Sequence, residues 1–291
     1  MKPYLIVTHD YNRKSAGGKA LHRLCHYLNL SGGDAYVTSD VRNSELVTPL
    51  ASPELQAEIA ERGIVVYPEV EQGNRLGAKQ VVRYVLNVPG RIRGDEDFDS
   101  SEAVFIYSDV LRRYVPNSSG TLTVPVVDLS IFGMDEQYDR YSWLHWVGKG
   151  VESKIDGLLS SMVADVMCNP ALADSFAHSE ITFDWPLTWE GLARAFRQSL
   201  LFVSFTPYTM LTVEARLCGC PVAVIPNSYF SREDFERAMP GMNGLAWGLD
   251  AAEVERARQT VGQFQYDYQE SVAQFFVQFD RFIDKTQRWV R

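Results

Sequence analysis

The sequence predicts an α/β protein with two doubly wound parallel-sheet domains and a helical C-terminal tail. Short apolar runs alternate with amphipathic segments, the alternation restarts after the polar stretch 133–142, and residues 251–291 show helical spacing. Parallel strands need crossover helices that cover both faces of a sheet, so this alternation predicts doubly wound domains. The length of 291 residues suits two domains of ordinary size.

The elements follow in order along the chain. In the first half we expect strands at 4–8, 34–39, 64–68, 102–108 and 121–127, and helices at 17–33, 52–63 and 75–90. The helix at 52–63 has the clearest ends, because Ser52 is a typical N-cap, Pro53 suits the first helical position and Gly63 terminates it. In the second half we expect strands at 143–147, near 180, at 200–205 and at 221–225, with helices at 188–199 and between 209 and 219.

These elements define the expected domains. We expect an N-terminal domain at 1–138, a C-terminal domain at 139–262 and a final helix at 263–291, for which packing back on the N-terminal domain is one arrangement. The phenylalanines of that helix are expected to be packing positions rather than a membrane or partner face; they are Phe275, Phe276, Phe279 and Phe282.

Composition limits the function. Hydrophobic residues make up 46% of the sequence, a value typical of globular proteins. The formal net charge of -9 argues against a nucleic-acid partner without excluding one. No apolar stretch reaches the ~18 residues that span a bilayer, and the N-terminus is typical of a strand rather than a signal peptide, so we expect a cytoplasmic protein. Contact with a membrane surface stays open. Cys25, Cys168, Cys218 and Cys220 contain no C-x-x-C pair and are expected to be reduced.

Three strand-to-helix junctions carry the candidate chemistry, because ligands of open α/β sheets bind beyond the carboxyl ends of the strands. The first junction holds Gly17 and Gly18, which let a backbone approach a ligand or merely permit a turn. The second holds Lys149 and Lys154, which can neutralise a diphosphate or form an ordinary solvated pair.

The third junction lies in "LLFVSFTPYTMLTVEARLCGCPVAVIPN", residues 200–227. Thr209 is expected to cap a helix there, and the amides around Met210, Leu211 and Thr212 would face an anion. Glu214 is expected on the first turn of this helix, where the helix dipole alone would favour an acid.

Together these segments resemble the GT-B glycosyltransferases, specifically their retaining, sugar-nucleotide-dependent branch. The Gly17-Gly18 pair, the Gly148-Lys149-x-x-x-x-Lys154 spacing and "TPYTMLTVEARLCGCPV" match three family motifs in order, and 126–132 is similar to the family's linker. The resemblance implies two Rossmann-like domains that face each other across a cleft, and a donor-binding site formed by the residues of these motifs. Glu214 would bind the ribose hydroxyls, Lys149 and Lys154 the diphosphate, and the amides from Thr209 to Thr212 together with Gly17-Gly18 the phosphates.

Two departures from the family are visible. The first signature glutamate, which contacts the donor sugar in the family, falls at Thr206, and lysine replaces arginine at Lys149. The candidate catalytic residues are Asp10, Glu69 and Thr206, and for the first two a loop-capping role is at least as well supported. His22 and His26 are spaced i, i+4, but without an H-E-x-x-H pattern they do not predict a metal site.

The sequence therefore predicts a metal-independent glycosyltransferase without a cofactor. It would move a sugar from a nucleoside diphosphate-sugar to an unidentified hydroxyl acceptor, such as a bacterial or phage glycan, with retention. The alternatives are a sugar-nucleotide epimerase or a phosphorylase of the same fold, and a sugar-nucleotide-binding protein without catalysis. Glycosylation of a modified nucleic acid is a further alternative that the acidic charge disfavours.

Overall fold

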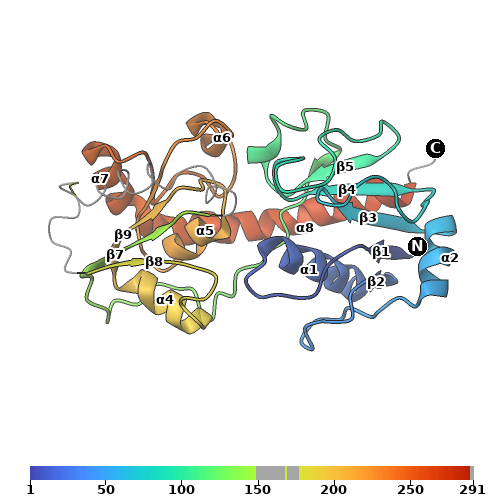
Figure 1. Ribbon diagram of the computed structural model, residues 1–291, viewed down its shortest axis with the longest axis horizontal. Coiled ribbons are helices and arrows are strands. Elements are labelled where there is room, and N and C mark those ends of the chain that lie inside the picture. Colours follow the sequence, from blue (N-terminus) through green and yellow to red (C-terminus); the bar gives the residue numbers. More distant parts are fainter. Residues whose placement is uncertain (149–167, 169–176, 289–291) are drawn as a thin grey trace. The chain divides into compact units, whose positions relative to one another are not determined.

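The computed structural model describes residues 1–148, 168 and 177–288 and divides the chain into two compact units. The N-terminal unit comprises Met1–Val126 together with Ser271–Arg291, and the C-terminal unit comprises Val127–Glu270. Each unit contains a parallel sheet with helices against it, as the sequence predicts (Figure 1).

The N-terminal unit has a six-stranded sheet in the order β2-β1-β3-β4-β5-β6, and every pair of neighbours is parallel. The strands are β1 (Tyr4–Ile6), β2 (Ala35–Val37), β3 (Ile64–Pro68), β4 (Val81–Val85), β5 (Ala103–Ile106) and β6 (Gly120–Thr121). The helices are α1 (Ala16–Leu30), α2 (Pro53–Arg62) and the 3-10 helix η1 (Asp109–Leu111). The ends predicted for α2 are confirmed, since the Ser52 side chain accepts a hydrogen bond from the Leu55 amide and Pro53 begins the helix.

Successive residues of a strand point to opposite sides of the sheet, and helices cover both sides of this sheet. On one face Leu5 and Val65 form a buried cluster with Ile59 of α2. On the other, Tyr4 and Phe105 pack against Phe282 of the C-terminal helix, with ring centroids 6.1 and 4.9 Å apart. The strands are therefore buried on both sides, which explains their nearly continuous apolar sequences.

The helix expected at 75–90 is wrong, because its middle part is the central strand β4. Gly77 adopts a φ of +62° in the turn before the strand, and the Asn74 side chain bonds both the amide and the carbonyl of Ala78. All five residues of Val81–Val85 are buried. A β-branched run flanked by neighbouring strands gains more from the sheet than from a helical turn.

The strand expected at 121–127 is also largely wrong, since β6 ends at Thr121. Beyond it the backbone bonds mainly to side chains: the Thr123 amide donates to Gln278 Oε1, and the Val124 carbonyl accepts from the Tyr107 hydroxyl. Pro125 has no amide hydrogen to continue a ladder, so this segment, of which Leu122, Val124, Val126 and Val127 are buried, does not form a strand.

In the described part of the C-terminal unit the sheet has five parallel strands in the order β11-β10-β9-β7-β8. The strands are β7 (Ser142–Trp146), β8 (Ala177–Glu180), β9 (Ser199–Ser204), β10 (Val222–Val224) and β11 (Leu245–Trp247). The helices are α4 (Trp189–Arg197), α5 (Met210–Leu217), α6 (Arg232–Glu236), α7 (Ala251–Thr260), the 3-10 helix η3 (Val261–Gln263) and α8 (Phe264–Arg288). Neither α6 nor β11 was expected from the sequence.

This second sheet is also packed on two sides. Trp143, Leu201 and Val203 form a buried cluster with Val254 and Ala257 of α7. On the other side Phe202 contacts Phe196 of α4, with ring centroids 5.3 Å apart. Arg140 donates to the carbonyls of Ser199 and Cys218, so one side chain satisfies the ends of a strand and a helix.

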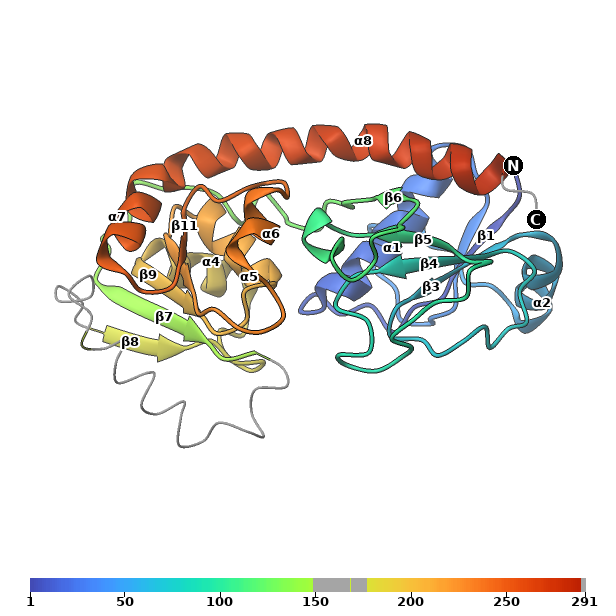
Figure 2. The same cartoon turned by 90° about the horizontal axis from the view of Figure 1, so that it is seen from above.

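Helix α8 is continuous from Phe264 to Arg288 and its residues belong to both units (Figure 2). The units change at Val126/Val127, at the segment identified as a linker by resemblance, whereas the sequence placed the domain limit at 138. Phe275, Phe279 and Phe282 are buried as predicted, but Phe276 is exposed, so its expected packing role is wrong. None of the described helices is long and apolar enough to span a membrane.

Candidate functional site

The carboxyl edge of the C-terminal sheet is organised around the ends of β7 and β9. These strands pair directly, and the Phe205 amide donates to the Trp146 carbonyl at 2.9 Å just beyond their last paired residues. The Thr206 hydroxyl then donates to the Val147 carbonyl at 3.1 Å. Thr206 therefore adds one side-chain bond to the ladder and joins the loops that follow the two strands.

The side chain of Thr206 packs closely against Gly148. Its φ is +92°, in the left-handed region that favours glycine, and a Cβ at this position would lie 1.9 Å from Thr206 Oγ1. Thr206 is itself only 9% exposed. The expected catalytic candidate Thr206 is thus packed against backbone rather than open to solvent.

Helix α5 follows this loop and carries Glu214. The helix begins at Met210, so Glu214 is the fifth helical residue and not part of the first turn, which contains no acid. The expectation that the helix dipole accounts for this residue is therefore wrong, since that effect falls off within the first turn. Glu214 is 5% exposed, and a buried carboxylate is costly unless donors surround it.

The start of α5 differs from the starts of α1, α2 and α4. Thr209 occupies the N-cap position, but its side chain makes no capping hydrogen bond, whereas Ser15, Ser52 and Thr188 cap α1, α2 and α4. The Thr212 hydroxyl donates to the Thr209 carbonyl at 2.8 Å and so is committed to the helix. The first-turn amides of α5 are therefore not capped by the Thr209 side chain, although the Thr212 amide donates to the Thr209 carbonyl at 3.3 Å. First-turn amides without a side-chain cap bind anions well.

Arg216 connects α5 with two neighbouring segments of the C-terminal unit. It is buried and donates to the carbonyls of Thr212, Gly241 and Asn243, while its guanidinium lies 3.8 Å from the ring centroid of Phe264. Burial lowers the pKa of Arg216 to about 9, which leaves it charged at neutral pH. α5 is thereby held to the 241–243 loop and to the start of α8.

Lys149 and Lys154, predicted to contact a diphosphate, lie outside the described residues. Lys149 directly follows Gly148, which lies two residues beyond the end of β7, and Lys154 comes five residues after Lys149.

An aromatic group at the end of β8 was not expected from the sequence. Phe183 packs edge-on against Trp146, with ring centroids 5.3 Å apart, and Phe183 and Trp185 are both exposed. Thr182 fixes their turn, because its amide donates to the Trp185 carbonyl and its hydroxyl accepts from the Trp185 amide. Exposed rings of this kind stack with planar ligands. Their exposure depends on tertiary packing, so "TFDWPLT" alone gives no signal of it.

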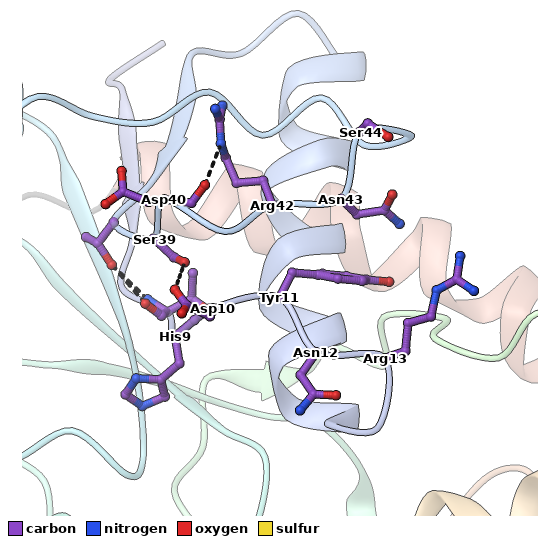
Figure 3. A pocket seen from close by; sticks show the side chains of 12 residues that line it. His9, Asp10, Tyr11, Asn12, Arg13, Ser39, Asp40, Arg42, Asn43 and Ser44 are labelled. Carbon is purple, nitrogen blue, oxygen red and sulfur yellow. Dashed lines mark hydrogen bonds between the residues drawn. The ribbon is translucent and has the colours of Figure 1, made fainter. Parts of the chain in front are cut away.

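The described residues of the N-terminal unit contain a polar pocket of about 830 Å³ at the ends of β1 and β2. It is lined by two segments, 8–13 and 38–44; the lining residues are Thr8, His9, Asp10, Tyr11, Asn12, Arg13, Thr38, Ser39, Asp40, Arg42, Asn43 and Ser44. Figure 3 shows Ser39 next to Asp10, with Asn12, Arg13 and Asn43 further along the two segments.

Asp10 is held by a contact between the two segments of this pocket. The Ser39 hydroxyl donates to Asp10 Oδ1 at 2.8 Å, and the Ser39 side chain is buried (Figure 3). The Thr8 amide donates to Thr38 Oγ1, and the Thr38 hydroxyl donates back to the Thr8 carbonyl, so the strand ends are clamped together. The Ser39 hydroxyl therefore orients the exposed carboxylate of Asp10 through one oxygen.

His22 packs against the pocket segment 8–13, through His9 and Tyr11. It is fully buried in α1, its Nε2 lies 3.1 Å from the His9 carbonyl, and its ring meets Tyr11 edge-on. Burial lowers the pKa of His22, so the ring is neutral and its Nε2 donates to the carbonyl. His26 accepts a hydrogen bond from the Val47 amide, and the described residues contain no group of three potential metal ligands.

Glu69, the other acceptor-side candidate, is almost completely buried. Its Oε2 accepts from the Leu86 amide at 2.9 Å, and the side chain is 3% exposed. Burial raises the pKa of Glu69 to about 7, although hydrogen bonds from backbone amides oppose the shift. These contacts join the ends of β3 and β4, which favours the loop-capping role.

Gly17 and Gly18 lie inside the first turn of α1 rather than before it. The Gly18 amide donates to the Ser15 hydroxyl at 3.2 Å, and neither glycine has a positive φ. Their place as a phosphate-binding turn remains a prediction from the family motif.

The sequence matches no protein family profile and no curated protein. Three solved structures are similar over nearly their whole length. One is an alpha-glucosyltransferase in complex with UDP and a 13-mer DNA containing an HMU base, with 11% identity, 96% of this chain and 99% of that chain covered, and a TM-score of 0.50.

The second is the DNA-modifying enzyme beta-glucosyltransferase in the presence and absence of UDP-glucose, with 9% identity, 98% and 99% coverage, and a TM-score of 0.54. The third is a variant of BGT of phage T4 in complex with UDP-glucose, with 9% identity, the same coverage and a TM-score of 0.52. Two parallel-sheet α/β units and a long C-terminal helix are thus shared with these enzymes, and the chain has the GT-B glycosyltransferase fold.

Proposed function

We propose that the chain is a glycosyltransferase that uses a UDP-sugar as donor. The observation that supports this most is the carboxyl edge of the C-terminal sheet, where the ends of β7 and β9 are tied together and α5 carries a buried Glu214. The three similar structures contain UDP or UDP-glucose, which favours UDP among the nucleoside diphosphates.

The proposed roles follow the geometry of α5. Glu214 accepts hydrogen bonds from the ribose hydroxyls, because a fixed carboxylate offers two acceptor oxygens to two neighbouring donors. The first-turn amides from Met210 to Thr212 lie next to the diphosphate, with Lys149 and Lys154 as its counter-charges. Charge on the diphosphate grows as the glycosidic bond breaks, so these groups act more strongly in the transition state.

Replacing Glu214 with alanine is expected to raise the Kd of UDP about 10- to 100-fold, since a hydrogen bond to a charged group contributes roughly 1.5–3 kcal/mol. Isothermal titration of the wild type and the variant with UDP measures this. The variant Glu214→Gln keeps the size of the buried side chain and reports whether a loss arises from charge or from packing.

Glu255→Ala is the matched control, because Glu255 is an exposed acid of α7 in the same unit. The control is expected to bind UDP as the wild type does. A wild-type protein that binds none of UDP, GDP or ADP would refute the proposed function, and unchanged binding in Glu214→Ala would refute the role of this residue.

We further propose that the pocket of the N-terminal unit receives the acceptor, with Asp10 as the base. Its carboxylate would take the proton from the acceptor hydroxyl as the oxygen attacks the sugar, and the bond from Ser39 aims the carboxylate. The names of the similar enzymes include both alpha- and beta-glucosyltransferase, so the fold does not fix the stereochemistry, and retention stays a prediction.

A hydroxyl-bearing base in DNA is the second candidate for the acceptor. Two of the similar structures are described with DNA or as DNA-modifying, and Arg13 and Arg42 line the pocket where a phosphate would approach. The net charge of -9 opposes this candidate.

Incubation with radiolabelled UDP-glucose and DNA that contains HMU is expected to label the DNA, whereas the same oligonucleotide with thymine, which lacks the hydroxyl, stays unlabelled. Asp10→Asn is expected to slow the transfer at least about 100-fold, a typical loss for a general base. Hydrolysis of UDP-glucose without labelling of HMU DNA would remove DNA as the acceptor and leave the donor proposal intact. Accumulation of an epimerised UDP-sugar in the same reaction would favour the epimerase alternative.

A further inference from the structure

We propose that His22 and His26 of α1 are positioning residues that hold the two segments of the polar pocket, 8–13 and 38–44, in place for the acceptor. This inference rests on the proposed function of the pocket. The histidines are spaced i, i+4, so they lie one turn apart on the same side of α1. Each ring makes a hydrogen bond to the backbone of a different segment. The spacing therefore has an explanation that needs no metal ion.

His22 holds the first pocket segment. Its Nε2 lies 3.1 Å from the His9 carbonyl, and its ring meets the Tyr11 ring edge-on, with centroids 5.2 Å apart. Both contacts fall on residues that line the pocket, on either side of Asp10. Nδ1 of His22 is buried and has no hydrogen-bond partner among the described residues, so the bond at Nε2 orients the ring. The ring therefore fixes the peptide that directly precedes Asp10.

His26 holds the second pocket segment through the residues that follow it. Its Nδ1 accepts a hydrogen bond from the Val47 amide at 2.9 Å, and Asn29 donates to the Val47 carbonyl at 3.1 Å. Side chains of α1 thus bind both polar groups of the Val47 backbone. The next carbonyl, that of Thr48, accepts from Arg42 at 3.2 Å, and Arg42 lines the pocket. One further hydrogen bond therefore connects the contact at Val47 with the pocket.

The pocket segments depend on such contacts because neither of them forms a helix or a strand. They contact each other through the Tyr11 amide, which donates to the Val41 carbonyl at 2.8 Å, and through the bond from Ser39 to Asp10. The bonds from α1 hold this pair of segments to the rest of the unit. A segment that moves must be ordered when a ligand binds, which weakens binding. Loss of either histidine bond is therefore expected to weaken the acceptor site.

Both bonds require a neutral imidazole. A protonated ring carries a hydrogen on each nitrogen. Nδ1 of a charged His26 could therefore not accept from the Val47 amide. Nδ1 of a charged His22 would be a buried donor without a partner among the described residues.

The surroundings of the two rings favour the neutral form. Burial lowers the pKa of His26, and the charge of Arg23 on the same helix lowers it further. Burial also lowers the pKa of His22, which its backbone hydrogen bond and Asp10 oppose and Arg42 supports. A lowered pKa means that the hold on the segments is complete above about pH 6.5 and is lost as the pH falls through the lowered value.

The test replaces each ring with a side chain that either keeps or removes the bonding atom. The amide nitrogen of glutamine can take the place of histidine Nε2, and the amide oxygen of asparagine the place of Nδ1. His22→Gln and His26→Asn therefore keep the two bonds but cannot be protonated, whereas His22→Leu and His26→Leu remove them. Gln56→Leu is the matched control, because Gln56 of α2 donates to the Ala51 carbonyl at 3.0 Å, outside the pocket segments.

Hydrogen exchange followed by mass spectrometry measures how firmly the segments are held and needs no ligand. At about pH 7.5, His22→Leu is expected to raise the exchange rate in 8–13 about fivefold, and His26→Leu that in 41–48 by the same factor, which corresponds to about 1 kcal/mol. In both segments His22→Gln, His26→Asn and Gln56→Leu are expected to stay within about twofold of the wild type.

A change of pH tests the neutral ring without a leucine variant, so it decides the matter even if those variants do not fold. Between about pH 7.5 and about pH 5.5 the exchange rate in 41–48 of the wild type is expected to rise about fivefold, after correction for the intrinsic pH dependence of exchange. His26→Asn is expected to keep its protection over the same range, because its amide does not titrate.

Transfer of glucose from UDP-glucose to DNA that contains HMU measures the effect on the site. We expect kcat/KM to fall about fivefold in each leucine variant and to stay within about twofold of the wild type in His22→Gln, His26→Asn and Gln56→Leu. The Kd of UDP is expected to be unchanged in all of them, because UDP is proposed to bind the C-terminal unit.

Other results would overturn the inference. Exchange in the leucine variants equal to that of the wild type would show that the histidines do not hold the segments, as would an equal loss of protection in His26→Asn on acidification. Faster exchange with unchanged kcat/KM would make the histidines structural residues only. A wild type that binds no UDP would refute the proposed function, and one that labels no HMU DNA would remove that acceptor. In either case the exchange rates still confirm or overturn the hold of the histidines on the pocket.

Discussion

Replacing Arg83 with methionine is expected to lower the free energy of unfolding of the N-terminal unit by about 3–5 kcal/mol, the usual cost of removing one partner from a buried ion pair. Arg83 lies in the central strand β4, 1% exposed, and binds the 7% exposed Glu102 through Nε and a terminal nitrogen, both at 3.0 Å. Its remaining donors bind the carbonyls of Glu71 and Gly73. In the variant, the Glu102 carboxylate and the carbonyls of Glu71 and Gly73 would lose the hydrogen bonds that Arg83 donates.

Urea denaturation of the wild type and the variant measures this loss. The matched control is Arg288→Met, because Arg288 pairs with Asp284 on the exposed face of α8, and such pairs contribute at most about 1 kcal/mol. The double variant Arg83→Met with Glu102→Leu is expected to regain much of the loss, since no charge remains buried. Equal effects of Arg83→Met and Arg288→Met would show that burial of the pair does not matter.

The loss at Arg83 would also reach the candidate acceptor site. Arg83 fixes the segment that contains Glu71, and Glu71 Oε1 lies 3.6 Å from Nε2 of His9, one of the pocket residues. The methionine variant is therefore expected to be less active even below the temperature at which it unfolds.

Replacing Gly148 with alanine is expected to lower the free energy of unfolding of the C-terminal unit by more than about 3 kcal/mol. A φ of +92° costs a residue with a Cβ about 1–2 kcal/mol, and the new Cβ would lie 1.9 Å from Thr206 Oγ1. Threonine is stiff at χ1, so it can escape only by changing rotamer and losing its bond to Val147.

The variant Gly248→Ala separates the cost of the backbone conformation from the cost of the contact with Thr206. Gly248 has nearly the same φ, +89°, but nothing lies within 4 Å of the position that its Cβ would take. The control should therefore lose only the cost of the backbone conformation. The double variant Gly148→Ala with Thr206→Ala should recover the difference between them, and equal losses at 148 and 248 would show that Thr206 does not press on Gly148.

The location of the candidate residues near strand ends was predictable because it follows from the alternation of strands and helices. Residues 4–8 and 200–205 are apolar runs followed by helical segments, residues 143–147 are a further apolar run, and parallel strands end at one edge of their sheet. Asp10, Gly148 and Glu214 were therefore placed near strand ends without any knowledge of their contacts. The fold class, the order of these junctions and the burial of Phe275, Phe279 and Phe282 also follow from local patterns.

Segments whose secondary structure depends on other parts of the fold were not predictable. Val81–Val85 has a spacing compatible with a helix and became a central strand because β3 and β5 flank it. Residues 122–127 are as apolar as a strand, yet side chains from Tyr107 and Gln278 satisfy part of their backbone instead.

By itself the sequence determined the two parallel-sheet units and most of their strands, because periodicity and turn residues act over a few positions. Only the tertiary structure decided what the residues at the strand ends do. The bond from Ser39 to Asp10 joins residues 29 positions apart, and the bond from Thr206, which also packs against Gly148, to Val147 joins residues 59 positions apart. The burial of Glu214 is likewise a property of the packed unit. A contact between distant segments depends on the register of whole strands, which no short stretch of sequence contains.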